Sequence, residues 1–133
     1  MKTLSKHPNA LILFLSILLS FVILRIYLHF FPNTDFNVGR YNIHHLYSGL
    51  ILIALGGVPL ALFEHDGLAR KIALAIFGVG LSMALDEWVF LIATDGTNAS
   101  YSLPVSFWGG VILTALVCEY VIITDLLIKR KQP

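Results

Sequence analysis

Four apolar stretches dominate this chain of 133 residues and leave few folds open to it. Each is close to the ~20 residues that an α-helix needs to cross the hydrocarbon core of a bilayer. Charged residues make up 13% of the chain, well below the fraction usual in soluble domains, and the mean hydropathy is +0.81. We therefore expect an integral membrane protein with helices over residues 9–31, 43–63, 72–93 and 106–128.

Short connections rich in turn-forming residues separate the four stretches. They lie around Pro32–Asp35, Glu64–Gly67 and Asp95–Asn98. Because short loops favour antiparallel neighbours, the sequence predicts one transmembrane domain over 1–133, an all-α up-down-up-down four-helix bundle. The first stretch is too long for the apolar part of a secretory signal peptide, so we expect it to remain as a membrane helix.

The basic residues are distributed unevenly between the two ends of this predicted bundle. Only Arg40 falls in a loop at one end, whereas seven basic residues fall at the other: Lys2, Lys6, Arg70, Lys71, Lys129, Arg130 and Lys131. Loops that remain in the cytoplasm carry such an excess of Lys and Arg. We therefore expect a multi-pass protein of the cell membrane with both termini in the cytoplasm.

Two adjacent carboxylates, Asp86 and Glu87, interrupt the third apolar stretch. An ionised carboxylate in hydrocarbon costs several kcal/mol unless it is paired, so such residues usually face the interior of a bundle. Counting about 1.5 Å per residue along each helix places Arg25 at about the same depth, in the outer half of the membrane. The same count places His29, His44 and His45 about one to two turns further out. Ionisable residues of three helices thus converge on one layer.

Three interpretations of this polar layer remain open from the sequence. In the first, Arg25 neutralises Asp86 or Glu87, and the layer is a structural ion-pair network in a packing or assembly protein. In the second, His44, His45, Asp86 and Glu87 bind a metal, with His29 and Glu119 as additional ligands. Imidazole and carboxylate donors suit Zn²⁺ or non-haem iron, whereas a haem between His29 and His45 is disfavoured. In the third, protons or small solutes move through the bundle.

Small residues indicate where the helices approach one another. The patterns are Gly57-x-x-x-Ala61, Gly80-x-x-x-Ala84 and Gly110-x-x-x-Thr114. Small residues one turn apart allow close contact between membrane helices. The single cysteine, Cys118, excludes an internal disulfide and is expected to be buried.

Charge and motifs narrow the range of partners. The net charge is +1 and no basic footprint of the kind that binds nucleic acid is visible, so we expect the lipid bilayer, and not nucleic acid, as a partner. A homo-oligomer is compatible with the sequence. It contains no nucleophile elbow, P-loop, HExxH or CxxC motif, which leaves both enzymatic activity and substrate open.

The polar motifs also carry a resemblance. Residues 40–49 (RYNIHHLYSG), Gly80-Leu81 and Asp86-Glu87 resemble the IHH and DE motifs of a family of small prokaryotic four-helix integral membrane proteins. The resemblance extends over residues 40 to about 108. It implies the same membrane bundle and brings no activity with it.

Overall fold

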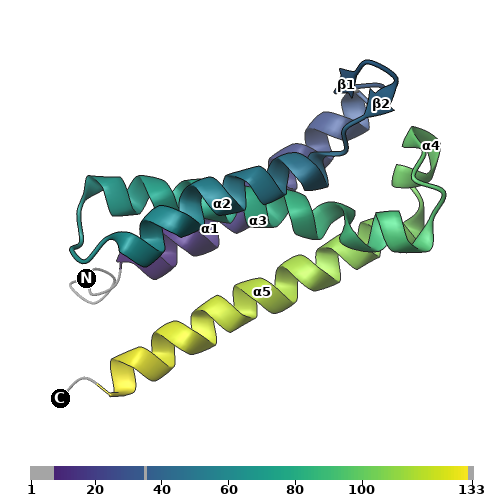
Figure 1. The fold of residues 1–133 in the computed structure, drawn as a ribbon. Helices are drawn as coiled ribbons and strands as arrows, with labels where there is room; N and C mark the ends of the chain where they lie inside the picture. Colours follow the sequence, from purple (N-terminus) through teal and green to yellow (C-terminus); the bar gives the residue numbers. More distant parts are fainter. Residues whose placement is uncertain (1–7, 35, 132–133) are drawn as a thin grey trace.

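The computed structural model describes residues 8–34 and 36–131 and is an all-α bundle of four long helices (Figure 1). The long helices are α1 (Pro8–Phe30), α2 (His45–Leu62), α3 (Leu68–Ala93) and α5 (Pro104–Arg130). The connections add a short helix, α4 (Asn98–Tyr101), and a two-stranded antiparallel hairpin of β1 (Asn37–Val38) and β2 (Tyr41–Asn42). Lys2, Lys6 and Asp35 lie outside the described residues.

Each predicted stretch forms one of the long helices, and the differences lie at the ends. α3 begins at Leu68, four residues earlier than the hydropathy indicates, because its first turn continues past the apolar stretch and includes the basic Arg70 and Lys71. Pro104 occupies the first turn of α5, where its missing N–H leaves no hydrogen bond unmade. Hydropathy therefore locates the apolar part of a helix but does not detect a polar first turn.

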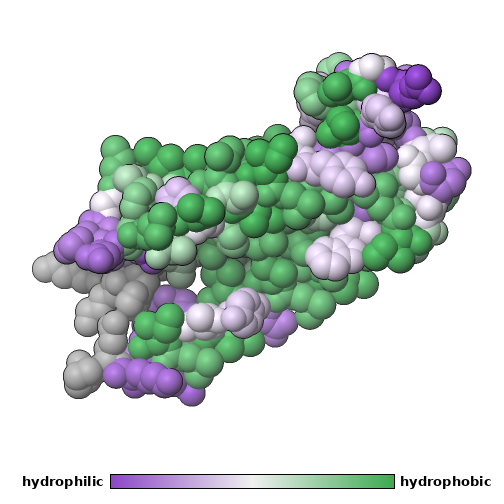
Figure 2. Space-filling view, in the orientation of Figure 1, coloured by the Kyte–Doolittle hydropathy of each residue, from purple (hydrophilic) through white to green (hydrophobic). Residues whose placement is uncertain are grey.

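All four long helices are long and apolar enough to cross a membrane. Large aliphatic side chains point outward along them; Ile23, Ile51 and Ile92 are between 63% and 75% exposed. Figure 2 shows a mainly hydrophobic surface through the middle of the molecule, with hydrophilic residues gathered towards its two ends. These features are those of a multi-pass membrane protein.

Helix α3 is the centre of the bundle and packs against α2, α1 and α5. Its closest approach is to α2, where two glycines face it. A Cβ added to Gly49 would lie 2.6 Å from the Gly80 carbonyl oxygen, and one added to Gly56 would lie 2.6 Å from the Ala73 carbonyl oxygen. The two backbones are therefore nearly in contact, which only residues without a side chain permit.

The predicted small-residue contacts are correct on two helices and wrong on the third. Gly80, Ala84, Gly110 and Thr114 are buried between helices. On α2, however, the contact is made by Gly49 and Gly56, whereas Gly57 is only partly buried and Ala61 is exposed. Gly56 and Gly57 are adjacent, so they point about 100° apart and only one of them can face α3.

The α1–α2 and α3–α5 connections both contain local structure that the sequence analysis did not predict. The hairpin β1–β2 turns at Gly39, whose φ of +63° is accessible mainly to glycine. The second loop turns at Gly96, with φ of +72°, and then forms α4. The hairpin and α4 lie at one end of the bundle, and the first turn of α1 and the last turn of α5 lie at the other (Figure 1).

Candidate functional site: a buried layer of histidines and carboxylates

The carboxylates of Asp86 and Glu87 are both buried, with 0% and 3% of their surface exposed. They lie on α3, about five turns from its first residue and near its last, in the part of the helix that leads towards α4. Consecutive helical residues point about 100° apart, so the two carboxylates meet different neighbours. Side chains and one backbone group from α1, α4 and the beginning of α2 bind them.

Arg25 of α1 is the main cationic partner of Asp86. Its Nε lies 2.5 Å from Asp86 Oδ1, and its Nη2 donates to the carbonyl oxygens of Asp86 at 3.3 Å and Ser106 at 3.1 Å. A Cβ added to Gly110 would lie 2.9 Å from that Nη2 and 3.1 Å from Asp86 Oδ1, so the glycine makes room for the pair. One guanidinium thereby ties α1, α3 and α5 together.

The second oxygen of Asp86 receives two further contacts. His45 Nε2 lies 2.9 Å from Oδ2, and the Tyr101 hydroxyl of α4 donates to the same atom. The Tyr101 ring also lies over the Arg25 guanidinium, with 4.3 Å between its centroid and Cζ. Burial, and then the nearby Asp86 carboxylate, raise the pKa of Tyr101, so its hydroxyl remains a donor.

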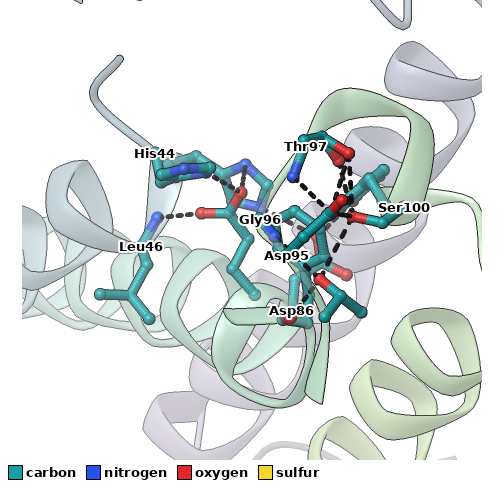
Figure 3. Close-up of polar contacts among 12 residues, drawn as sticks. His44, Leu46, Asp86, Asp95, Gly96, Thr97 and Ser100 are labelled. Carbon is teal, nitrogen blue, oxygen red and sulfur yellow. Dashed lines mark hydrogen bonds and ion pairs between the residues drawn. The ribbon is translucent and has the colours of Figure 1, made fainter. Parts of the chain in front are cut away.

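Glu87 binds the beginning of α2 (Figure 3). Its Oε2 accepts a hydrogen bond of 2.7 Å from the backbone N–H of Leu46, and its Oε1 lies 3.2 Å from Nδ1 of both His44 and His45. The first N–H groups of a helix have no partner within the helix, and a negative charge there is favourable. The carboxylate therefore caps α2 from a neighbouring helix, in place of the N-cap side chain that His44 does not supply.

His45 lies between the two carboxylates and presents both ring nitrogens to them. Nε2 faces Asp86 at 2.9 Å, and Nδ1 faces Glu87 at 3.2 Å. A neutral imidazole has one donor and one acceptor nitrogen, whereas an imidazolium has two donors. If both carboxylates are ionised, a protonated His45 satisfies both contacts. Together with Arg25, it also brings the charge of these four residues to zero.

A turn outside the membrane helices holds Tyr101 in place. Asp95 Oδ1 accepts hydrogen bonds from the Thr97 N–H at 3.1 Å, the Thr97 hydroxyl at 2.9 Å and the Ser100 hydroxyl at 2.6 Å (Figure 3). These bonds, first among them that from Ser100, lower the pKa of Asp95. The turn begins α4, and α4 carries Tyr101 over Asp86.

A pocket of about 280 Å³ adjoins the cluster. Glu87, His44, His45 and Ser48 line it in the interior, while Thr34, Phe36, Asn42 and Asn98 line it nearer the hairpin and α4. Tyr27 and Phe90 form apolar parts of its wall. The pocket thus extends from the α1–α2 and α3–α5 connections to the imidazoles and to one carboxylate.

The structure brings five of the predicted residues together: Arg25, His44, His45, Asp86 and Glu87. It places the two additional candidates elsewhere. His29 is exposed on α1 and packs edge-on against Phe30, and Glu119 is exposed on α5. Across residues 8–34 and 36–131, no group of three or more His, Cys, Asp and Glu side chains is arranged as a ready metal site. The metal ligation expected from the sequence therefore stays a prediction.

Sequence reasoning missed three contributors to the cluster: the Tyr101 hydroxyl, the Leu46 N–H and the Ser106 carbonyl. The sequence analysis assigned no role to Tyr101. The Asp95-Gly96-Thr97 turn signal ahead of it indicates a chain reversal, which returns the next residues to the end of α3. The two backbone groups have no signature in the sequence.

Fold and site together define this protein as a membrane-helix bundle with a buried histidine–carboxylate layer near one end. In a comparison with known proteins, no family model, curated protein or solved structure matches the chain.

Proposed function

We propose that this chain is a small multi-pass protein of the cell membrane whose Asp86–His45–Glu87 cluster exchanges protons with the outer side. The exchange would serve proton or small-solute movement. The observation that carries the proposal is the position of His45, which has a carboxylate oxygen at each ring nitrogen. Histidine is the side chain whose unperturbed protonation changes nearest to neutral pH.

The surroundings of His45 explain why its proton would matter. When the imidazolium loses a proton, one of its nitrogens presents a lone pair to a carboxylate oxygen, and that contact becomes repulsive. We expect the contact between His45 and Glu87 to break first, because Arg25 and Tyr101 also hold Asp86 in position. Glu87 in turn binds the Leu46 N–H and lines the pocket. Protonation is thereby linked to the start of α2 and to the shape of the pocket.

The pocket provides a route by which protons or small solutes reach the cluster. It connects the outer loops to His44, His45 and Glu87, so a proton or a small polar solute that enters from the loop end reaches the cluster without crossing the apolar part of the bundle. Arg25 lines a separate pocket and forms an ion pair with Asp86 Oδ1. The cluster thus has one fixed ion pair and one exchangeable proton.

Nitrogen-15 NMR of histidine-labelled protein in bilayers tests this proposal, because the ¹⁵N shifts of imidazole and imidazolium differ. We expect both the imidazole and the imidazolium form of His45, assigned by its loss in His45→Asn, to be seen as the pH is varied. Glu87→Gln should change the balance between the two forms, whereas His29→Asn should leave it unchanged. A His45 that is neutral from about pH 5 to 9 in the parent would show that the proposal is wrong.

Proton movement can be measured separately in liposomes that contain the protein and an entrapped pH-sensitive dye. After an acid pulse outside, the interior should acidify faster than in empty liposomes, and Glu87→Gln should slow it. Equal rates in all three preparations would leave the cluster as the structural ion-pair network alone.

One specific observation favours a second candidate, a divalent transition metal bound by His44, His45 and Glu87. Ligand atoms about 2.0–2.1 Å from a tetrahedral Zn²⁺ lie about 3.3 Å from one another. Nδ1 of each histidine is 3.2 Å from Glu87 Oε1, and the other nitrogen of His45 faces Asp86, the usual second partner of a metal-binding imidazole. The ion would replace protons between these atoms.

Calorimetry with Zn²⁺ or Fe²⁺ separates the two candidates. Metal binding should release protons and raise the melting temperature of the parent, and a chelator should reverse both effects. His44→Ala and Glu87→Gln should abolish the response, whereas His29→Ala should retain it. If the parent shows no heat of binding and no change in melting temperature, the metal candidate is wrong.

A further inference from the structure

Glu119 is exposed on α5, near the middle of a helix of 27 residues. It lies only two residues from the helix midpoint, about 3 Å along the axis, so it is deep in the membrane. None of the hydrogen bonds or ion pairs described within residues 8–34 and 36–131 involves it. Ionisable residues at such depth usually face a bundle interior or a partner, because hydrocarbon offers them no hydrogen bond.

The surface around Glu119 has the spacing of a coiled-coil seam. Six exposed residues of α5 follow one another at steps of 4, 3, 4, 3 and 4, namely Trp108, Ile112, Ala115, Glu119, Ile122 and Leu126. We call these six residues the α5 seam. Alternation of three and four keeps side chains on one face that another helix can cover. Trp108, Ile112 and Leu126 are between 51% and 59% exposed.

The α5 seam is not the face with which α5 joins its own bundle. The buried residues of α5 are Ser106, Gly110, Thr114 and Cys118, each four residues after the last. At 100° per residue, this buried row is centred about 140° from the seam. The seam therefore points away from α1 and α3 and remains free for another helix.

We propose that a second copy of this chain covers the α5 seam, forming a parallel two-fold dimer in which the two Glu119 carboxyl groups hydrogen bond to each other. Two copies inserted with the same orientation place the same residue at the same depth, so Glu119 meets Glu119 without any further requirement. A protonated carboxyl group donates and accepts, and is thus its own complement. No cation from another protein is needed.

Ala115 supports this choice of partner. It lies one turn before Glu119 on the seam, and a small residue there lets two helices approach closely enough for the carboxyl groups to meet. Polar side chains that hydrogen bond across helices strengthen association in membranes. The dimer is independent of the proton site, because Glu119 is remote from the residues that line the adjoining pocket.

Disulfide cross-linking of full-length protein in bilayers tests the arrangement. Ala115→Cys and Ile122→Cys should each form a covalent dimer on oxidation. Leu127→Cys, exposed on α5 but off the seam, is the matched control and should not; nor should the parent, whose Cys118 is buried. Cross-linking that is equal at all exposed positions, or absent at positions 115 and 122, overturns the proposal.

Dimer dissociation measured by single-molecule photobleaching at several protein-to-lipid ratios tests the role of Glu119. Glu119→Gln retains a donor and an acceptor and should dimerise like the parent, whereas Glu119→Leu should dissociate on the order of tenfold more readily. Leu127→Ala should behave like the parent. A monomeric parent at every ratio, as expected if a different protein covers the seam, overturns the proposal, and so does a Glu119→Leu dimer as tight as the parent.

Discussion

Asp86 and Glu87 are neighbours in sequence with different structural roles. Asp86 holds Arg25, His45 and Tyr101, and so joins the helices around α3, whereas Glu87 caps the start of α2. The sequence analysis grouped both carboxylates with Arg25 and the histidines, and left open which carboxylate pairs with Arg25. It could not assign those partners, because helix rotation and tilt decide which side chains meet.

Removal of Arg25 should be among the most damaging single changes. Arg25→Leu leaves Asp86 buried with less compensating charge, which costs on the order of 3–5 kcal/mol of unfolding free energy. Adding Asp86→Asn should recover much of that loss, because no unpaired charge remains. Reversible unfolding in mixed micelles measures both, with the exposed Arg130→Leu as the control. A double variant no more stable than Arg25→Leu would show that another group is the main partner of Asp86.

The Asp95 turn should make the α3–α5 connection sensitive to acid. Because hydrogen bonds from Ser100 and Thr97 lower the pKa of Asp95 in the folded protein, its contribution to stability is present above the unfolded value of 3.8. That contribution is lost as the pH falls through the folded value. The protection factors of the amides in residues 94–103, which compare their exchange with that of an unfolded chain at the same pH, should therefore fall on acidification below about pH 4 in the parent. In Asp95→Asn they should be low already at neutral pH, and equal protection factors in both proteins would contradict this.

At the scale of the elements, hydropathy predicts all four long helices but not which face of each is buried. Nearly every face of a membrane helix is apolar, so the sequence lacks the polar–apolar alternation that marks the buried face of a soluble helix. Polar residues supply the missing information for α3, because Asp86 must face inward. On α2 no deep polar residue indicates the buried face, and the sequence analysis chose Gly57 where Gly56 packs against α3. Only the contact between the two helices identifies the buried glycine.

Adjacent glycines on α2 provide a matched pair for testing this packing. Gly56→Ala should destabilise the bundle by roughly 1–3 kcal/mol, because the new methyl group would lie 2.5 Å from the Phe77 nitrogen. Gly57→Ala should be neutral or stabilising by up to ~1 kcal/mol, since its methyl group meets only the Phe77 ring at 3.5 Å and alanine favours the helix. Thermal unfolding of both variants in bilayers measures the difference. Equal losses would show that α2 is rotated relative to this structure.

For the molecule as a whole, the arrangement of its ends decides which compartment reaches the histidine–carboxylate layer. The N-terminal end of α1, the α2–α3 connection and the C-terminal end of α5 lie at one end, away from the hairpin and α4 (Figure 1). Among the described residues, Arg70, Lys71, Lys129, Arg130 and Lys131 belong to the first end, and Arg40 is in the hairpin turn. The first end therefore carries a clear excess of basic residues over the hairpin end.

We accordingly expect the hairpin, α4 and the mouth of the pocket to face outward, with both termini in the cytoplasm. A reporter fused after Pro133 should be active only if it functions in the cytoplasm. In intact cells, a membrane-impermeant maleimide should label Thr34→Cys but not Glu64→Cys, since these exposed residues lie in connections at opposite ends. After lysis it should label both. Labelling of Glu64→Cys alone in intact cells would reverse the orientation, and the protons that reach His45 would then come from the cytoplasm.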